Sequence, residues 1–312
     1  MVQTDRIVCV AGPTASGKTR LAVELAKRLD AEVVSCDSMQ VYRRMDIGTA
    51  KPSPEEMGGI PHHMIDVAEP EEDYSVSRYC AAAAPIVEDI VARGKTAIIA
   101  GGTGLYMDSL IRGNDFAPFP STGVRERLEA QADAEGMEAM AAWLRGVDPE
   151  AAERIHDRKR LLRALEVYLE TGQTITEHNR RTQAIPPKFS PVWLGLDFED
   201  RQRLYDRIDL RVTKMLEMGL LEEIQGLLDS GVPETATAMQ AIGYKEFVNA
   251  LAGRETVEAA ADQVRQSSRR YAKRQLTWFR RNKAMHWLIR GERTAGEEIF
   301  RSARQLLREI DS

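Results

Sequence analysis

The chain has 312 residues, of which 43% are hydrophobic and 29% are charged, and its formal net charge at pH 7 is −5. This composition is typical of a soluble globular protein with one large domain or two smaller ones. The small acidic excess disfavours a global attraction to nucleic acid only weakly, because local clusters of charge matter more than the sum. No run approaches the roughly 18 apolar residues of a membrane helix, and no secretory signal is visible, so we expect a cytoplasmic protein with no membrane partner.

Strand and helix patterns alternate over the first part of the chain. Short apolar runs predict strands at 6–12 ("RIVCVAG"), 31–37 ("AEVVSCD") and 95–104 ("KTAIIAGGTG"), and "HHMIDV" is a candidate for a further strand. Apolar residues at helical spacing predict helices over 18–29 and 74–93. Such alternation predicts an α/β fold, with a parallel-sheet core and helices on both faces.

The pattern changes between two turn-rich segments, "NDFAPFPSTG" and "QAIPPKFSP". Only helical patterning lies between them, over 124–179, and strand patterning resumes at "PVWLGLDF". The sequence therefore predicts a core domain formed by 1–117 and 191–312, interrupted by a helical insertion domain at 118–190. The rest of the core is expected to be mostly helical, at 200–228, 256–281 and 295–310, with a last strand at "AMHWLI".

A phosphate-binding loop of the form G-x-x-x-x-G-K-[ST] follows the first strand and precedes the first helix. Its glycines let several backbone N–H groups point inward, and the helix N-terminus adds a partial positive charge. Lys18 can neutralise phosphate oxygens, and the Thr19 hydroxyl can ligate Mg²⁺. An incidental Gly-rich turn is the alternative, but the strand before and the helix after favour the binding loop. The predicted cradle comprises Gly12, Pro13, Thr14, Ala15, Ser16, Gly17, Lys18 and Thr19.

The loop indicates a polyphosphate ligand but does not say which bond breaks. Most such proteins have a second strand that ends in Asp and helps to hold Mg²⁺, whereas "TAIIAGG" ends in glycines. The nearest acid after a strand is Asp37, followed by Ser38 and Gln40. A carboxylate here could accept a proton from an amine, and an amide could pair with an adenine edge. Capping of a short helix by Asp37 or Ser38 is the alternative interpretation.

Cysteine and histidine give little sign of metal chemistry. Cys9, Cys36 and Cys80 form no C-x-x-C pair and are predicted to be small core residues in a reducing compartment. His62 and His63 lack further ligands at metal-binding spacing, so we expect them to have packing or turn roles.

Six motifs in register extend the argument: "GPTASGKT", "DSMQVYRRMDIGTAKP", "GGTGLY", "RLLRALEVYLETG", "AIGYKE" and "AKRQLTWFR". Together they resemble the bacterial tRNA dimethylallyltransferases, over nearly the whole chain from Ile7 to about Leu288. The resemblance implies a phosphate-loop α/β core with a helical insertion. It implies dimethylallyl diphosphate and a tRNA anticodon stem-loop as substrates, and Mg²⁺ as cofactor. The expected product carries the dimethylallyl group on N6 of the adenosine 3′-adjacent to the anticodon, and diphosphate is released.

The resemblance also assigns roles to residues. Asp37 matches the family's general base, Arg211 matches the arginine that holds the diphosphate, and Thr19 remains the expected Mg²⁺ ligand. We expect a monomer. The positions that match tRNA contacts are Asp37, Ser38, Met39, Gln40, Thr103, Arg125, Lys159, Arg160, Leu161, Leu162, Arg163, Gln240, Ala241, Ile242, Gly243, Tyr244 and Lys245.

A local basic run supports an RNA substrate despite the acidic total. Residues 263–291 contain no acid and nine lysines and arginines, among them Arg265, Arg269 and Lys273 at four-residue spacing. This pattern suits contact with phosphates, whereas a solvated helix face is the alternative. The interleaved aromatic residues are expected to be core. The competing functions are a phosphate-loop small-molecule kinase that uses ATP and a non-catalytic RNA-binding protein.

Overall fold

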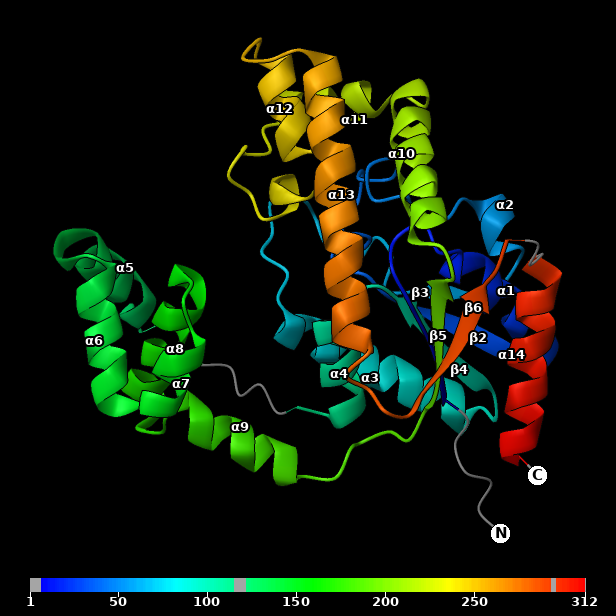
Figure 1. Cartoon of the computed structure of the whole chain (residues 1–312), viewed down its shortest axis with the longest axis horizontal. Helices are drawn as coiled ribbons and strands as arrows, with labels where there is room; N and C mark the ends of the chain where they lie inside the picture. Colours follow the sequence, from blue (N-terminus) through cyan, green and yellow to red (C-terminus); the bar gives the residue numbers. More distant parts are fainter. Residues whose placement is uncertain (1–6, 115–121, 293–295, 312) are drawn as a thin grey trace. The chain divides into compact units, whose positions relative to one another are not determined.

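The computed structural model describes residues 7–114, 122–292 and 296–311. The chain forms two compact units. One unit combines the segment that ends at Gly113 with the segment that begins at Lys188, and the other runs from Asn114 to Pro187. We call them the core and the insertion (Figure 1). The predicted boundary between 117 and 118 lies outside the described residues.

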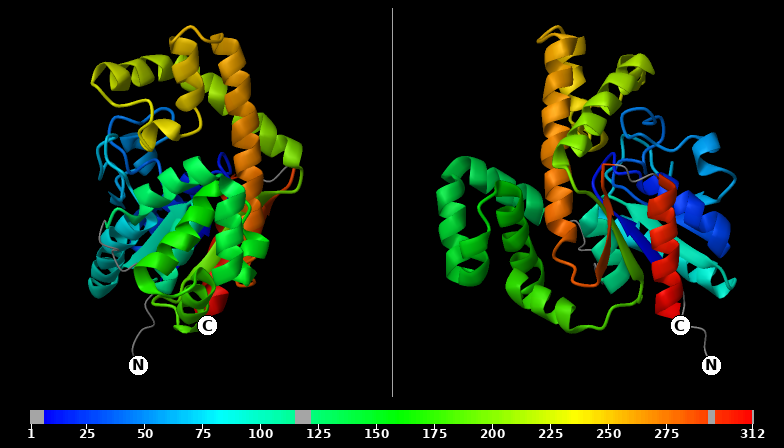
Figure 2. Two further views of the ribbon diagram at one scale, coloured as in Figure 1. Left: turned by 90° about the vertical axis from the view of Figure 1, so that its left-hand side faces the viewer. Right: turned by 45° about the vertical axis from the view of Figure 1, so that its right-hand side comes forward.

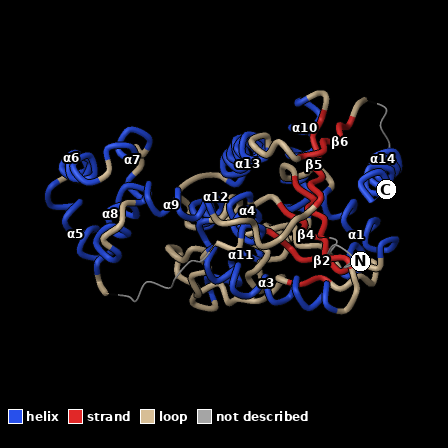
Figure 3. The backbone as a smooth tube through the Cα atoms, turned by 90° about the horizontal axis from the view of Figure 1, so that it is seen from below, coloured by secondary structure: helices blue, strands red, loops and turns tan. Residues whose placement is uncertain are grey.

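The core contains a six-stranded sheet in the order β3-β2-β4-β1-β5-β6, and every neighbouring pair of strands is parallel. Figure 3 shows these strands, in red, among the surrounding helices. The α/β prediction is confirmed. The strands are β1 (Ile7–Ala11), β2 (Ala31–Cys36), β3 (His62–His63), β4 (Thr96–Gly101), β5 (Val192–Phe198) and β6 (Met285–Arg290).

Helices cover both faces of this sheet (Figure 2). On one face, Val8 and Val10 of β1 pack with α1 (Lys18–Leu29) and α14 (Gly296–Asp311). On the other lie α3 (Val76–Ala92) and α4 (Gly104–Arg112). Because successive side chains of a strand point to opposite faces, both faces of these near-continuous apolar strands are buried. The helical period read over 18–29 is confirmed to the residue.

A helical layer follows β5 and contains α10 (Arg201–Glu217), which packs beside α13 (Val257–Phe279) (Figure 1). The helical expectation over 200–228 is confirmed, but the chain breaks at Gly219, whose φ of 96° lies in the left-handed region, and continues in a new helix. The remaining elements of the core are α2 (Pro54–Met57), α11 (Leu220–Asp229), the 3₁₀ helix η1 (Ala238–Gln240) and α12 (Lys245–Leu251).

The insertion is helical over its described residues, and it has an apolar core of its own that includes Leu128, Leu144 and Leu165. The chain returns from it beside the place where it left. The amide of Lys188 donates to the carbonyl of Arg112, and the amide of Phe189 donates to that of Ile111. Its helices are α5 (Val124–Glu135), α6 (Met137–Val147), α7 (Pro149–Arg154), α8 (Arg158–Thr171) and α9 (Ile175–Ala184).

The histidine pair has the structural role that we expected. His63 Nε2 lies 2.8 Å from Glu32 Oε2, and His62 Nδ1 lies 2.8 Å from the carbonyl oxygen of Ile60. The strand read as "HHMIDV" is only two residues long, because Met64 adopts a φ of 63° directly after it. The three cysteines are buried and free. Within the described ranges, no cluster of His, Cys, Asp or Glu could hold a metal ion, and no helix is long and apolar enough to cross a membrane.

Candidate functional site

The phosphate loop curls between β1 and the start of α1. Ala15 and Gly17 adopt φ angles of 61° and 90°, which turn the backbone toward the helix N-terminus. Lys18 Nζ donates to the Pro13 carbonyl at 2.7 Å and so lies folded over the loop. Ser16 is fully buried, and its Oγ has no hydrogen-bond partner among the described residues. A buried hydroxyl without a partner inside a cradle of amides fits a loop built for an anion.

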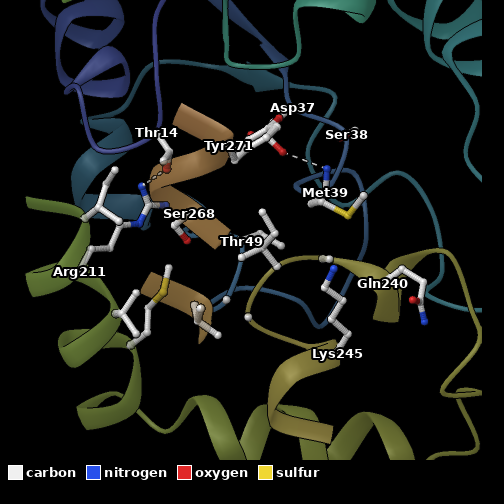
Figure 4. A pocket seen from close by; sticks show the side chains of 18 of the residues that line it. Thr14, Asp37, Ser38, Met39, Thr49, Arg211, Gln240, Lys245, Ser268 and Tyr271 are labelled. Carbon is white, nitrogen blue, oxygen red and sulfur yellow. Dashed lines mark hydrogen bonds between the residues drawn. The ribbon is translucent and has the colours of Figure 1, made fainter. Parts of the chain in front are cut away.

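Two helices brace the loop through Thr14. The Thr14 amide donates to Gln275 Oε1 at 2.8 Å, and Gln275 Nε2 donates to the carbonyl of Gly102 after β4. Arg211 Nη1 donates to Thr14 Oγ1 at 3.1 Å (Figure 4). Arg207, one turn earlier on α10, donates to the Ala15 carbonyl at 2.8 Å. No local pattern points to Gln275 as part of the site, because its partners are remote in the chain.

A cavity of about 350 Å³ opens beside Thr14. Figure 4 shows Asp37 and Arg211 on its wall, with Tyr271 and Ser268 of α13 between them. The structure thus brings together Thr14, Asp37, Arg211 and the 240–245 segment from four separate parts of the sequence. The cavity is lined by Thr14, Asp37, Ser38, Met39, Gly48, Thr49, Ile208, Arg211, Val212, Met215, Gln240, Ala241, Ile242, Gly243, Lys245, Val264, Ser268, Tyr271 and Arg274.

Asp37 follows β2 and caps a turn rather than a helix. Its Oδ1 accepts from the amides of Met39 and Gln40, at 2.9 and 3.4 Å. The residue that shapes this turn also lines the cavity. The neighbouring amide of Ser38 donates to Thr103 Oγ1 at 3.1 Å, so the contact residue expected after β4 supports this turn.

The expectation that the Gln40 amide reads an adenine edge needs correction. Gln40 Nε2 donates to the carbonyls of Thr49 and Ala50, and its Oε1 accepts from Ser35 Oγ at 3.0 Å. Both ends of the side-chain amide are engaged, so Gln40 braces the loop over 37–50.

One side of the cavity is apolar. Ile208, Val212 and Met215 project from α10 around Arg211, and Val264 faces them from α13. The sequence holds a signal for this wall, because apolar residues flank Arg211 at positions −3, +1 and +4, which share one helix face. A surface of this kind can take a hydrocarbon group next to the phosphate loop.

A single carboxylate, that of Glu223, fixes the loop over 37–50. Glu223 of α11 accepts from the amides of Asp46, Ile47 and Gly48 at 2.7, 2.8 and 3.1 Å. It also accepts from the Tyr244 hydroxyl at 2.6 Å. Tyr244 belongs to the predicted contact segment, but its side chain is fully buried. It therefore packs beneath the wall of the cavity and does not line it. Burial raises the pKa of Tyr244, and the neighbouring Glu223 adds to this shift.

Burial also changes the acid–base behaviour of the cations. Desolvation lowers the pKa of Lys18 to about 8, although the carboxylate of Asp37 opposes the shift. Desolvation lowers the pKa of Arg211 as well. Burial raises the pKa of Tyr271 to about 12, so its hydroxyl stays protonated at neutral pH. The site therefore gathers cations that lack bulk water, and an anion would relieve this.

The basic face of α13 is partly neutralised. Arg269 Nη1 bonds both carboxylate oxygens of Asp209, at 2.6 and 2.8 Å, and Arg265 pairs with Asp262. Lys273 and Arg274 are exposed, and Arg274 reaches the cavity. Of the interleaved aromatic residues, Phe279 is core as predicted. Trp278 is half-buried and donates from Nε1 to Asp108 at 2.8 Å, and Tyr271 lines the cavity.

In the insertion, the predicted contact residues divide by exposure. The side chains of Leu161 and Leu162 are buried in its core, so their expected side-chain contact with tRNA is corrected. Helical geometry puts them on the inner face of α8 and leaves Lys159, Arg160 and Arg163 exposed. Arg125 pairs with Glu129 at 2.8 Å.

Over residues 40–282 the sequence matches the family model described as IPP transferase. A tRNA dimethylallyltransferase of Thermoanaerobacter sp. (strain X514) is 45% identical over 298 residues, which cover 94% of this chain and 95% of that one. A tRNA dimethylallyltransferase of Acetivibrio thermocellus is 42% identical over 306 residues, which cover 97% of each chain.

Two solved structures of tRNA-modifying transferases are similar to this chain. The full-length tRNA isopentenylpyrophosphate transferase from Bacillus halodurans superposes with a TM-score of 0.74 at 40% identity, covering 99% of this chain and 97% of that one. A eukaryotic dimethylallyltransferase acting on tRNA superposes with a TM-score of 0.83 at 28% identity, covering 98% of this chain and 80% of that one.

Proposed function

The chain belongs to the IPP transferase family, and from that premise we propose that it is a tRNA dimethylallyltransferase. It transfers the dimethylallyl group of dimethylallyl diphosphate to N6 of the adenosine 3′-adjacent to the anticodon, and diphosphate is released. The observation that carries this proposal is that Asp37 and Arg211 line one cavity beside the phosphate loop. A proton acceptor and an anion holder thus face a common space.

The chemistry needs both groups. The exocyclic amine attacks C1 of the dimethylallyl group, the C1–O bond breaks, and the bond electrons leave with the diphosphate. Charge builds on the bridging oxygen, where Lys18, Arg211 and the loop amides stabilise it; one preorganised donor is typically worth about 3 kcal/mol. The N–H becomes acidic as the new bond forms, and Asp37 takes that proton. No bond to phosphorus is made or broken.

The two substrates require different surfaces. The target base leaves its stack to reach the cavity, at a cost of a few kcal/mol. The dimethylallyl group would lie against Ile208, Val212 and Met215, where apolar contact excludes water from the reacting carbon.

Magnesium fits this donor set. Mg²⁺ prefers oxygen ligands, and in phosphate sites it takes few of them from protein and the rest from phosphate and water. The Thr19 hydroxyl would hold it, next to the partnerless hydroxyl of Ser16 in the same cradle. When bound, the ion neutralises charge on the diphosphate. Monomeric organisation and cytoplasmic location complete the proposal.

The kinase alternative lacks a structural basis at β4. In phosphate-loop kinases an acid after a neighbouring strand helps to hold Mg²⁺. Here the strand ends at Gly101 and Gly102, where an added Cβ would lie 1.9 Å from the Cys36 carbonyl oxygen and 2.2 Å from Gln275 Nε2. The packing at this position thus excludes an acidic side chain.

Mass spectrometry of digested tRNA tests the proposal. Unmodified tRNA is incubated with the protein, dimethylallyl diphosphate and Mg²⁺, without ATP. We expect a five-carbon unit on an adenosine, and no such product when ATP replaces the prenyl donor. Absence of modified adenosine across a full set of tRNAs would contradict the proposal.

A further inference from the structure

Three arginines follow one face of α10 past the phosphate loop. Arg203, Arg207 and Arg211 are four residues apart, a spacing that places them in a row. Arg211 bonds Thr14, and Arg207 bonds the carbonyl of Ala15. Of these three arginines, Arg211 alone lines the cavity that holds Asp37. The row therefore continues beyond the cavity, along the outer side of the loop.

A fourth arginine approaches the same loop from β6. Its guanidinium lies against Gly17: a Cβ added to that glycine would be 2.9 Å from Arg290 Nη2. Arg290 Nε is buried and has no hydrogen-bond partner among the described residues. Arg203 donates to the carbonyl of Gly291, which keeps its guanidinium beside Arg290. A buried donor without a partner costs roughly 1–3 kcal/mol, so its placement beside the loop calls for a ligand.

The surroundings of Arg290 are positive. Desolvation lowers its pKa, and Arg207, Arg20 and Arg203 add to the shift. The first turn of α1 contains no acid to balance the helix dipole, and it carries Arg20. Within the described residues, none of these four arginines forms an ion pair with an acid.

A second cavity lies at this cluster. Arg20 and Arg290 line a space of about 190 Å³ between α1 and α14. Its lining also includes two acids, namely Glu24, which lies 3.8 Å from Lys27, and the exposed Glu297. The space is separate from the cavity that holds Asp37, since the two share no lining residue.

We propose that Arg20, Arg207 and Arg290 form a second phosphate-binding site on the outer side of the phosphate loop, and that it takes the diphosphate released from the cradle. That role as a product site rests on the proposed function, whereas the binding does not. The contacts at positions 14, 15 and 17 form a path, because Arg211, Arg207 and Arg290 meet successive parts of the loop. A diphosphate that moves along this path passes from one guanidinium to the next, so its negative charge stays close to a positive partner throughout.

Equilibrium dialysis with labelled inorganic diphosphate and Mg²⁺, on the full-length protein, tests the site. The wild type should bind two equivalents, and Arg290→Met should bind one. Methionine keeps an unbranched side chain against Gly17 and removes only the guanidinium. Arg211→Met should instead lose the cradle equivalent and retain the outer one. The matched control is Arg28→Met, which removes the same charge from the far end of α1, about 12 Å from Arg20 along the helix axis, and should keep both equivalents.

The outcomes separate this inference from the proposed function. Binding of one equivalent by the wild type, or of two by Arg290→Met, overturns the second site. Thermal unfolding midpoints close to wild type exclude misfolding, and Arg20→Met provides a second variant. If two equivalents bind while no tRNA is modified, the site stands and only its role in product release falls. If tRNA is modified with one equivalent bound, the inference fails and the proposed function survives.

Discussion

The backbone amide of Thr14 donates a hydrogen bond of 2.8 Å to Oε1 of Gln275, 261 residues further along the chain. The other end of the same buried amide donates to the carbonyl of Gly102 at 2.9 Å. One side chain of α13 thereby joins the phosphate loop to the loop after β4. Since Tyr271 lies one turn earlier on α13 and lines the cavity, the helix ties the donor site to the acceptor site.

Gln275→Met should weaken use of the prenyl donor. It leaves the Thr14 amide without its partner, a loss of roughly 1–3 kcal/mol that corresponds to about 10- to 100-fold. We expect KM for dimethylallyl diphosphate to rise by that factor, while KM for tRNA changes little. Steady-state kinetics with each substrate varied checks this. Gln263→Met, at an exposed site of the same helix, is the control, and an unchanged donor KM in Gln275→Met would refute the bracing role.

Asp37→Asn separates the role of Asp37 as a proton acceptor from its role in shaping the turn. The asparagine oxygen can still accept from the Met39 amide, so the turn keeps its shape while the proton acceptor is lost. We expect kcat to fall roughly 10²- to 10⁴-fold with little change in tRNA affinity. Asp37→Ala, which loses the turn as well, should also weaken tRNA binding. Single-turnover rates and filter binding measure the two effects, and full activity in Asp37→Asn would mean that another group accepts the proton.

Glu223→Gln should loosen the segments that form the cavity wall, although Glu223 itself does not line the cavity. A carboxylate accepts from three loop amides and Tyr244, whereas a glutamine presents an N–H to some of these donors. We expect a lower melting temperature and a several-fold higher KM for tRNA, because an unsatisfied buried donor costs about 1–3 kcal/mol. The neighbouring exposed Glu222→Gln provides the comparison. Equal behaviour of the two variants in thermal unfolding and kinetics would argue against this anchor.

Diphosphate affinity should depend on pH through Lys18. Burial lowers the pKa of this amine to about 8, so its charged fraction in the free protein falls as pH rises from 7 to 9. Above pH 8 the binding of an anion must therefore be accompanied by proton uptake, and affinity drops. In Lys18→Arg the guanidinium stays charged across this range. Calorimetric titration of both proteins should show the wild type losing affinity relative to the variant above pH 8; parallel profiles would count against the lowered pKa.

Exposed cations of α13 should set the salt dependence of tRNA binding. Lys273 is exposed, and its ammonium is available for a phosphate, whereas Arg269 is already neutralised by Asp209. Lys273→Met should reduce the slope of log K against log salt by about 0.7–0.9. Arg269→Met, one turn away, should change the slope much less. Binding isotherms at several salt concentrations measure both slopes, and equal slopes in all three proteins would remove Lys273 from the interface.

Local patterns predicted the parts of the site that are local in sequence. The phosphate loop follows from glycine spacing between a strand and a helix, and Asp37 follows from its position after a buried strand. Arg211 came from the resemblance, and the structure places it on Thr14. The sheet was predictable because near-continuous apolar runs bounded by glycine are typical of parallel strands.

Other features depend on contacts that no local pattern encodes. Gln275 and Glu223 act on backbone groups far away in the chain, so neither shows a spacing signal. Leu161 and Leu162 lie in a basic motif, but their side chains face inward because of the helical period. The break at Gly219 was missed because apolar residues continue at helical spacing across it.

The paired hydrogen bonds from Lys188 to Arg112 and from Phe189 to Ile111 have a consequence for how such a protein can change over generations. They clasp the outgoing and returning chains at one point of the core, so residues gained or lost between them leave the strand register of β1 and β5 untouched. Selection can thus revise the insertion while the prenyl-transfer chemistry stays fixed. A duplicated gene could acquire a new RNA partner by exchange of this one segment.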